Sequence, residues 1–519
     1  MRTRTHLARG LAALAGLSLA ALGVVTLTSP EAVAATCTAG TANDFNGDGV
    51  GDTVLADPDA TVNGAKRAGL VRVVFGGGKG VSEISQATSG MAATPETGDG
   101  FGTSYAVYDA DLDGCADLVV AAPYEDVASG STQLVDAGAI YVIHGTATGI
   151  GAGSKIEGYT QGEFNPISTT EAYDWFGYAL KAGTTASNAP YLVAGVPGEN
   201  IAVNGTTYSD AGLIEYAQGS TRIGVSQNSA GVTGAIEAND RFGSSLAGTN
   251  RYFAVGSPGE SIGDEEFAGG VQVFSHTLSG GIPTPLLGLD QDSTGMTGTP
   301  EANDGFGTSI SMTGYRPSDQ TYNSDVLLAI GVPGEDVGTA ADAGGVSVVR
   351  IQPSGAFTQV TAMDGNTPSD LEGDAVAGDF MGQRVAITNT DTNVVTTSAT
   401  VRLAVGEPGK DVGTVKDAGA VHIIRPLDAA IGTADKILTR GSGLPGTATA
   451  RDYTGMALSA GSTYLYVGVP YSKESATSKG VLYVRSWTDV DGTTSTGTTT
   501  YRPGSGGLPD AGAALGAMR

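Results

Sequence analysis

The sequence DGFGTSISM (residues 304–312), followed by LLAIGVPGED (327–336) and GGVSVVRI (344–351), decides the fold of this chain. It combines an Asp-x-Phe-Gly segment, an apolar run ending in Gly-x-Pro-Gly-Glu, and a β-rich run that follows two small residues. Short apolar runs bounded by Gly, Pro and Asp are typical of β-strands. Pro333 is expected to end its strand, because proline cannot donate a hydrogen bond to a sheet ladder.

The same three-part pattern occurs seven times along the chain. Its prolines follow one another at intervals of about 60 to 75 residues, at Pro58, Pro123, Pro197, Pro258, Pro333, Pro408 and Pro470. Seven such units without linkers favour a radial arrangement, since an open stack would leave long exposed sheet edges. We therefore predict an all-β fold, a seven-bladed β-propeller of four-stranded antiparallel blades, with residues 35–519 as its single domain.

Two further expectations concern how the blades meet. The aromatic residue of each unit is predicted to wedge between neighbouring blades, as for Phe101, Phe176, Phe242 and Phe306. The tail, residues 504–517, resembles the start of a unit that lacks its remainder, whereas the first unit begins abruptly at Asp44. We expect residues 511–517 to complete the first blade; the alternative is that residues 38–43 supply that strand.

Residues 1–34 have the pattern of a secretory signal peptide. Arg2, Arg4 and Arg9 form a basic start, residues 11–28 are apolar, and Ala32-Val33-Ala34 fits a cleavage site. The formal net charge of the whole chain is −27, which argues against nucleic acid or an anionic membrane as a partner. We expect an exported protein without membrane insertion.

The repeat resembles the FG-GAP repeat of the seven-bladed N-terminal propeller of integrin alpha subunits, and above all the FG-GAP repeat proteins secreted by bacteria. The resemblance covers essentially all of residues 36–519. It implies a propeller of the integrin alpha type and an integrin-like role in extracellular ligand binding or cell adhesion.

Two segments carry the pattern of a metal-binding loop. DFNGDGVGD (44–52) fits D-x-N-x-D-G-x-x-D, and DADLDGCAD (109–117) fits D-x-D-x-D-G-x-x-D. Oxygen ligands at alternate positions, with a glycine for the sharp turn, can surround a hard cation. The predicted ligands are Asp44, Asn46, Asp48, the carbonyl of Val50 and Asp52 in one loop, and Asp109, Asp111, Asp113, the carbonyl of Cys115 and Asp117 in the other.

The two loops resemble the calcium hairpins of integrin-type propellers, so we expect two Ca²⁺ sites, confined to the first two blades. The second loop, with four aspartates against three and an asparagine, is expected to bind more tightly. Corresponding stretches elsewhere, such as residues 246–256, lack the ligands. The alternative is a pair of Asx-rich turns without metal.

Cys37 and Cys115 are the two cysteines of the sequence. In an exported protein a pair of cysteines favours one disulfide, with two free thiols as the alternative. A bridge would tether the N-terminal segment to the second acidic loop.

The remaining polar residues give no catalytic constellation. The acidic residues before each aromatic and after each Pro-Gly, such as Asp240 and Glu260, recur in several blades, which favours turn or cap hydrogen bonds. His144, His276 and His422 lie in the same kind of strand on different blades and are expected to be ordinary, hydrogen-bonded sheet residues.

The sequence therefore predicts a secreted, calcium-binding, non-catalytic monomer that binds an extracellular protein or polysaccharide. Loops after the prolines, residues 198–210, 259–268 and 334–343, are the expected recognition face. One alternative is a secreted hydrolase, or the accessory domain of a phospholipase-like enzyme, because FG-GAP propellers accompany phospholipases D specific for glycosylphosphatidylinositol. Another alternative is a structural component of the cell envelope.

Overall fold

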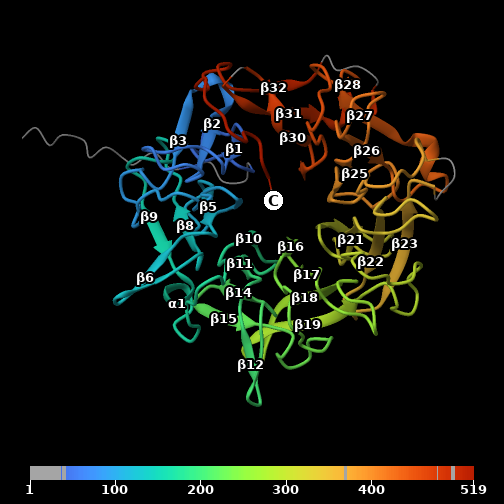
Figure 1. Cartoon of the computed structure of the whole chain (residues 1–519), viewed down its shortest axis with the longest axis horizontal. Coiled ribbons are helices and arrows are strands. Elements are labelled where there is room, and N and C mark those ends of the chain that lie inside the picture. The colour runs from blue at the N-terminus through green and yellow to red at the C-terminus, as the bar shows by residue number, and fades with distance from the viewer. Residues whose placement is uncertain (1–36, 38–41, 367–370, 476, 493–496, 519) are drawn as a thin grey trace, which may run out of the picture. The chain divides into compact units, whose positions relative to one another are not determined.

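The computed structural model describes residue 37 and residues 42–366, 371–475, 477–492 and 497–518. Residues 36–519 belong to one compact unit, and the predicted signal peptide, residues 1–34, lies outside the described residues. Within this unit seven antiparallel sheets succeed one another around a central axis (Figure 1). The prediction of an all-β, seven-bladed propeller is confirmed.

Each blade pairs its strands in chain order from the inside outward, apart from inserted hairpins. The first three blades contain β1 (Thr53–Asp57), β2 (Leu70–Val74) and β3 (Val81–Ile84); β4 (Ser104–Tyr108), β5 (Asp117–Ala122), β8 (Ala139–Ile143) and β9 (Ile156–Tyr159); and β10 (Leu180–Thr184), β11 (Pro190–Val196), β14 (Leu213–Gln218) and β15 (Thr221–Val225).

The fourth and fifth blades contain β16 (Ser245–Gly248), β17 (Tyr252–Ser257), β18 (Gly270–Ser279) and β19 (Ile282–Leu289), then β20 (Ile310–Tyr315), β21 (Asp325–Val332), β22 (Gly345–Ile351) and β23 (Phe357–Asp364). The last two contain β24 (Arg384–Asn389), β25 (Val401–Glu407), β26 (Ala420–Ile424), β27 (Lys436–Arg440) and β28 (Gly443–Leu444), then β29 (Ala457–Ala460), β30 (Tyr464–Lys473), β31 (Lys479–Ser486) and β32 (Thr499–Tyr501). The sixth blade has five strands because β28 adds a short parallel pairing to β27.

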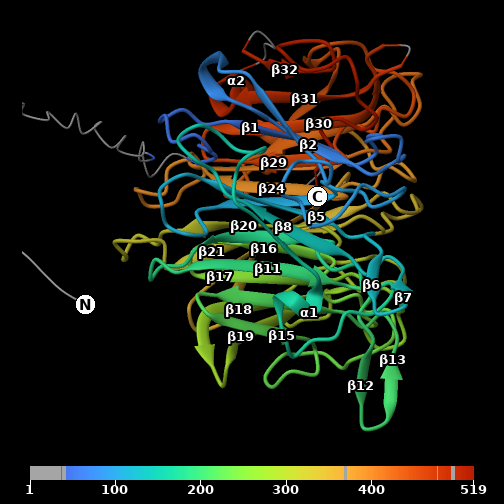
Figure 2. The same ribbon diagram turned by 90° about the vertical axis from the view of Figure 1, so that its left-hand side faces the viewer.

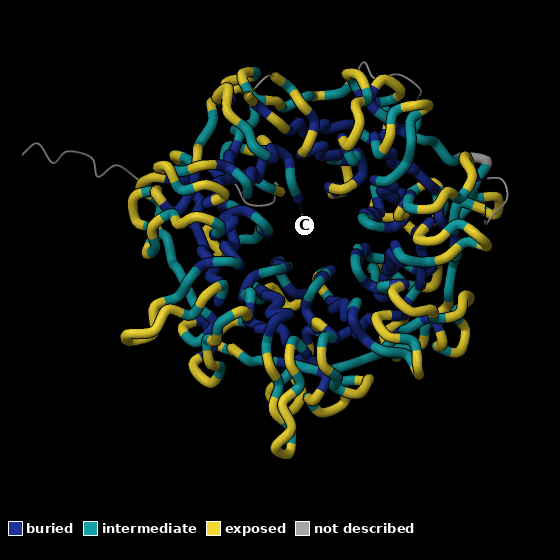
Figure 3. Tube along the Cα trace, viewed as in Figure 1, coloured by how far each residue is buried: buried dark blue, intermediate teal, exposed yellow. Residues whose placement is uncertain are grey.

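The hydrophobic core is divided into layers between neighbouring blades. The cluster around Phe306 draws on the fourth and fifth blades, and the cluster around Phe101 draws on the first and second. Figure 3 shows burial concentrated along the inner strands and exposure at the outer loops. The inner strands surround a central cavity of about 370 Å³.

The Phe-Gly segment links each blade to the one before it. The Phe306 amide donates to Ala268 O (2.8 Å), while the Gly307 amide donates to Gly331 O in its own blade (3.0 Å). Gly269, with φ +90°, lies so close that a Cβ there would be 2.3 Å from Phe306 O. The Phe306 side chain is fully buried, like that of Phe101. The predicted wedge is confirmed.

The first blade contains three strands of its own, and the tail lies along the inner edge of β1. The Gly516 amide donates to Ala56 O (2.9 Å), and the Ala514 amide donates to Asp57 Oδ1 (2.7 Å). Leu515 bridges to Gly480 of the seventh blade, as Phe242 bridges to Gly212 between the third and fourth blades. Figure 1 shows the C-terminus inside the ring.

Two hairpins are inserted after the proline of their blades. They are β6 (Val127–Ser129) with β7 (Thr132–Leu134) in the second blade, and β12 (Ile201–Val203) with β13 (Thr206–Tyr208) in the third. Both lie on the same side of the unit in Figure 2. Within the described residues, helical structure is limited to α1 (Gln161–Phe164), α2 (Trp487–Asp491) and two 3₁₀ turns, Gly76–Gly78 and Ile431–Ala434. None of these helices is long and apolar enough to cross a membrane.

Candidate metal loops and their surroundings

The first acidic loop, residues 44–52, precedes β1 and is shaped by carboxylates that accept backbone amides. Asp44 accepts from the amides of Asp48 (3.1 Å) and Gly49 (2.7 Å), and Asn46 Oδ1 also accepts from Asp48 (3.2 Å). Asp52 accepts from the Phe45 amide (2.9 Å) through one oxygen and from the Gly76 amide (2.8 Å) through the other. The side chains of Asp44, Asn46 and Asp52, at positions 1, 3 and 9 of the loop, therefore face the interior of the turn.

The second acidic loop, residues 109–117, connects β4 to β5 and repeats this arrangement. Asp109 accepts from Asp113 and Gly114 (both 3.1 Å), and Asp111 Oδ1 also accepts from Asp113 (3.3 Å). Asp117 accepts from the amides of Ala110 (2.8 Å) and Gly145 (2.9 Å). The equivalent bonds join equivalent positions, so the two loops have one backbone design.

The second loop has the dimensions of a cation site. Asp109, Asp111 and Asp113 each present a carboxylate oxygen within 4.8 Å of the other two. A Ca²⁺ ion binds oxygens at about 2.3–2.6 Å, so oxygens of one shell lie within about 5 Å of each other. The residues present therefore fit a hard cation. The same amide hydrogen bonds also satisfy part of an Asx-rich turn, which is the alternative that the sequence left open.

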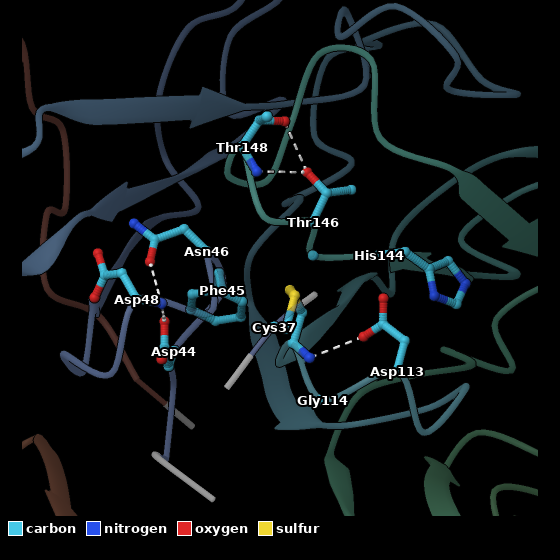
Figure 4. Close-up of a disulfide and its surroundings, with 12 residues drawn as sticks. Cys37, Asp44, Phe45, Asn46, Asp48, Asp113, Gly114, His144, Thr146 and Thr148 are labelled. Atoms are coloured by element: carbon cyan, nitrogen blue, oxygen red, sulfur yellow. Dashed lines mark hydrogen bonds between the residues drawn. A yellow bond between two sulfur atoms is a disulfide. The ribbon is translucent and has the colours of Figure 1, made fainter. Parts of the chain in front are cut away.

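The two loops contact each other directly (Figure 4). The Ala116 amide donates to Asp44 O (2.9 Å), and the Thr146 amide donates to Phe45 O (3.2 Å). Cys37 and Cys115 form a disulfide, which links the segment before the first loop to position 7 of the second loop. The disulfide expected from the sequence is thus present, and it lies between the two loops.

The charges around the loops differ. Lys79 Nζ lies 2.5 Å from Asp48 Oδ2, and this hydrogen bond lowers the pKa of Asp48. In the second loop the neighbouring basic group is His144, the residue after β8, whose Nδ1 lies 3.4 Å from Asp111 Oδ2 and 3.3 Å from Asp117 Oδ2. Burial raises the pKa of both Asp52 and Asp109.

A second recurrent feature is a buried pair of carboxyl groups between blades. Asp240 caps its turn by accepting from the Glu237 amide (2.6 Å), and Gln227 donates to the nearby Glu260. Burial raises the pKa of Asp240 to about 7 and that of Glu260 to about 8. The same arrangement holds for Asp99 with Glu125 and Gln86, Asp174 with Glu199 and Gln161, and Asp304 with Glu335 and Gln291.

In the last two repeats a basic residue takes part instead. Lys410 occupies the position of the glutamate and pairs with Asp379 (3.0 Å) and Glu407 (3.2 Å). Arg440 pairs with Asp452 (3.0 Å) and Glu474 (2.9 Å). The prediction that the recurrent acids make turn and cap hydrogen bonds is confirmed for the aspartates, whereas the glutamates accept from glutamine side chains, and these glutamine and basic partners were not foreseen.

The histidine prediction is confirmed for two of the three residues. His276 contacts Tyr216 Oη (3.0 Å) and Thr249 O (3.0 Å), and His422 pairs with Glu407 (3.2 Å) and Asp435 (3.0 Å). His144, in contrast, has no hydrogen bond to either ring nitrogen within the described part of the chain. The sequence does distinguish His144. When the repeats are aligned, VVFG (73–76) matches VIHG (142–145), so His144 occupies the position that Phe75 has in the first blade.

Comparisons with known proteins find similarity in one part of the chain. The FG-GAP repeat family matches residues 101–143, which extend from the Phe-Gly segment of the second blade to the end of β8. Together with the seven-bladed fold, this match supports an FG-GAP propeller protein.

The chain is similar to phosphatidylinositol-glycan-specific phospholipase D from Bos taurus, at 30% identity over 163 residues, and from Homo sapiens, at 30% over 162 residues. Each match covers 30% of this chain and only 18% of the relative. Among solved structures, a putative 6-phosphogluconolactonase from Bacteroides uniformis aligns with a TM-score of 0.42 at 10% identity, covering 89% of this chain and 98% of that one. A likeness of that size carries no argument about function.

Proposed function

We propose that this protein is a secreted, calcium-binding, non-catalytic propeller that binds an extracellular protein or polysaccharide, in an adhesion-like role. The observation that carries the proposal is the pair of acidic loops with one hydrogen-bond design, joined by a disulfide. Each loop is to hold one Ca²⁺ ion through the five positions named above.

The compartment follows from the same two features. Disulfides persist in oxidising environments such as the extracellular space. Extracellular modules hold calcium with dissociation constants of roughly 10⁻⁴ to 10⁻³ M, which suits the calcium concentration outside cells. The predicted signal peptide is consistent with this location, and the integrin-like resemblance supports ligand recognition as the role.

We replace the recognition face expected from the sequence, residues 198–210, 259–268 and 334–343, by the two inserted hairpins, of which one lies within 198–210. Residues 127–134 and 201–208 extend from neighbouring blades on the same side of the unit, and their tips are exposed (Figures 2 and 3). The equivalent turns in the fourth and fifth blades are shorter, with single bridges from Ile262 to Glu265 and from Val337 to Ala340. Loops on a rigid scaffold are where recognition is usually located.

A binding experiment tests this function. The purified protein is incubated with extracellular polysaccharide, collagen-like and cell-surface fractions, with calcium or with chelator. Replacing Ala202–Thr207 or Ala128–Gln133 by Gly-Gly is expected to abolish binding, whereas replacing Gly263–Asp264 in the fourth blade is the matched control and should preserve it. Equal binding by all three variants would contradict the assigned surface. Ligand binding of the same strength with chelator as with calcium would contradict the calcium role.

One observation favours a second candidate, the accessory domain of a phospholipase-like hydrolase. This observation is the similarity to phosphatidylinositol-glycan-specific phospholipase D described above, which is limited to 18% of that protein's length. Release of a glycosylphosphatidylinositol-anchored reporter by the purified protein would support the hydrolase. No release, together with ligand binding, would support the first function.

A further inference from the structure

His144 is a buried residue whose ring nitrogens face three carboxylates at 3.3–3.4 Å without making a hydrogen bond of regular geometry. Its side chain is 8% exposed, and neither ring nitrogen makes a hydrogen bond within the residues that the structure describes. Burying a polar group without a partner costs free energy, so such a group usually serves a ligand or a water. The ring faces the second acidic loop, beside Asp113 in Figure 4.

The atoms around Nδ1 have the spacing of a metal's first shell. Nδ1 lies 3.4 Å from Asp111 Oδ2 and 3.3 Å from Asp117 Oδ2, and these donors lie within 4.8 Å of one another. Zinc binds imidazole nitrogen and carboxylate oxygen at about 2.0–2.2 Å in tetrahedral geometry. Those bond lengths separate neighbouring donors by roughly 3.3–3.5 Å, which matches both distances.

We propose that His144 Nδ1, Asp111 and Asp117 form a binding site for a divalent transition metal of the zinc class. Calcium takes oxygen ligands, whereas imidazole suits zinc, copper, nickel and iron, so the histidine sets the class of metal. With three protein ligands, the fourth position is left for water or for a group of a bound partner.

The second shell supports this assignment. Glu157 Oε1 lies 3.3 Å from His144 Nε2, and Glu157 is itself contacted by Lys155 and Tyr159. A carboxylate that faces the far nitrogen of a ligating histidine fixes the ring and its tautomer. Asp117 is also fixed, because its two oxygens accept the amides of Ala110 and Gly145.

A route for the metal is present as well. Asp111, His144, Lys155, Glu157 and Tyr159 line part of a cavity of about 340 Å³, and the Asp111 side chain is 45% exposed. A metal ion can therefore reach the donors from solvent without opening the blade.

The first loop provides a natural comparison. Gly76 and Gly145 make equivalent bonds to Asp52 Oδ1 (2.8 Å) and Asp117 Oδ1 (2.9 Å), so the residues before them, Phe75 and His144, are equivalent. Phe75 offers no donor atom, and the first loop therefore cannot form such a site. Because Asp111 and Asp117 are also candidate calcium ligands, calcium is expected to compete with zinc at the second loop.

The test uses the purified protein without calcium, titrated with ZnSO₄ by calorimetry and with CoCl₂ by visible absorbance. We expect one zinc ion per chain and intense cobalt d–d bands from a tetrahedral site with a nitrogen ligand. His144→Phe, which copies the first loop, should weaken zinc binding at least 100-fold and remove the bands. Glu157→Gln should weaken binding about 10-fold, as second-shell changes typically do. Asp319→Ala, at an exposed aspartate outside both loops, is the control and should leave zinc binding unchanged.

The proposal would be overturned if the His144→Phe variant bound zinc within threefold of the parent's affinity, or if this variant kept the cobalt bands. If His144→Phe does not fold, as judged by circular dichroism, His144→Gln takes its place with the same expected loss. The inference does not rest on the calcium role, because its titrations contain no calcium. A parallel calcium titration of the same variants separates the failure of one from the failure of the other.

Discussion

The first acidic loop (44–52) and the second (109–117) have the same backbone hydrogen bonds but different neighbours. Lys79 pairs with a carboxylate of the first loop, and Phe75 precedes Gly76, whose amide donates to Asp52 of that loop. His144 faces the second loop from the equivalent position, with Glu157 behind it. The comparison teaches that the repeat sets the shape of a loop, whereas single side chains from the neighbouring strands set which cation it can hold.

The largest effect is expected from removing the bridge between the loops. Replacing Cys37 and Cys115 together by serine should lower the free energy of unfolding by roughly 2–5 kcal/mol, because the bridge closes a loop of 78 residues. Urea unfolding in the presence of calcium measures this loss. Calcium affinity should fall more at the first loop, since Gly47 packs against Cys37.

Reduction of the parent protein by dithiothreitol is the control and should reproduce the loss. An unchanged unfolding midpoint in the double serine variant would show that the hydrogen bonds from Ala116 and Thr146 alone hold the loops together.

The next largest effect is the loss of stabilisation by calcium, which is expected to differ between the two loops. Asp113→Ala should abolish the tighter site and with it about 2.7 kcal/mol of stabilisation at a calcium concentration 100 times Kd. Asp48→Ala should remove the weaker site and a smaller stabilisation at the same concentration. Thermal unfolding with calcium and with chelator measures both.

Asp264→Ala, an exposed aspartate in the fourth blade, is the matched control and should retain the full calcium response. If chelation leaves the melting temperature of the parent unchanged and Asp113→Ala behaves like the parent, the two segments are metal-free turns.

A third prediction compares how stability depends on pH for the buried carboxyl pairs and for the calcium loops. The pKa of Glu260 is about 8, above its unfolded value, so the folded state binds protons more tightly than the unfolded one. Stability from this group is therefore complete below about pH 4.5 and is lost as pH rises towards 8. Calcium-free protein should lose about 1 kcal/mol or more per pair over this range, whereas calcium-dependent stabilisation should persist at pH 8.

Urea unfolding at pH 5 and pH 8 with chelator measures the slope. Glu260→Gln should flatten it, because an amide keeps the contact with Gln227 and carries no charge. Glu266→Gln, an exposed glutamate nearby, should leave the slope as it is. A parent protein that is more stable at pH 8 than at pH 5 without calcium would contradict the buried pairs.

The smallest expected effect concerns Lys79. Lys79→Ala removes an ammonium group that competes with a cation for Asp48, so the calcium affinity of the first loop should rise by a few-fold. Calorimetric titration of Asp113→Ala with and without this change isolates the first loop. Lys66→Ala, at an exposed lysine without an ion pair among the described residues, is the control. A lower affinity in the Lys79 variant would mean that Lys79 orders the loop rather than competing within it.

Much of the fold is readable from the sequence, because each feature is repeated. The Phe-Gly segment, the small residues before β8 or β22, and the terminating proline occur in register, so one physical explanation covers every blade. The wedge position of Phe306 and the disulfide could therefore be foreseen. The acidic loops were visible because their ligands lie within nine residues of one another.

The remaining features depend on contacts between distant segments. Gln227 meets Glu260 and Lys79 meets Asp48 only after the strands pair, and neither spacing has a local signature. His144 resembles His276 and His422 in its strand position, but its surroundings include the loop 109–117, which no local pattern around His144 predicts. A side chain's partners, unlike its strand, are not set by the repeat.

The tail that lies along β1 has a consequence for how the chain matures. Residues 513–516 contact Ala56 and Asp57, which are synthesised more than 450 residues earlier. Residues 513–516 must therefore have been synthesised before the first blade gains its inner partner. Until then β1 keeps an unpaired inner edge, so loss of residues 513–516 by proteolysis is expected to expose that edge again.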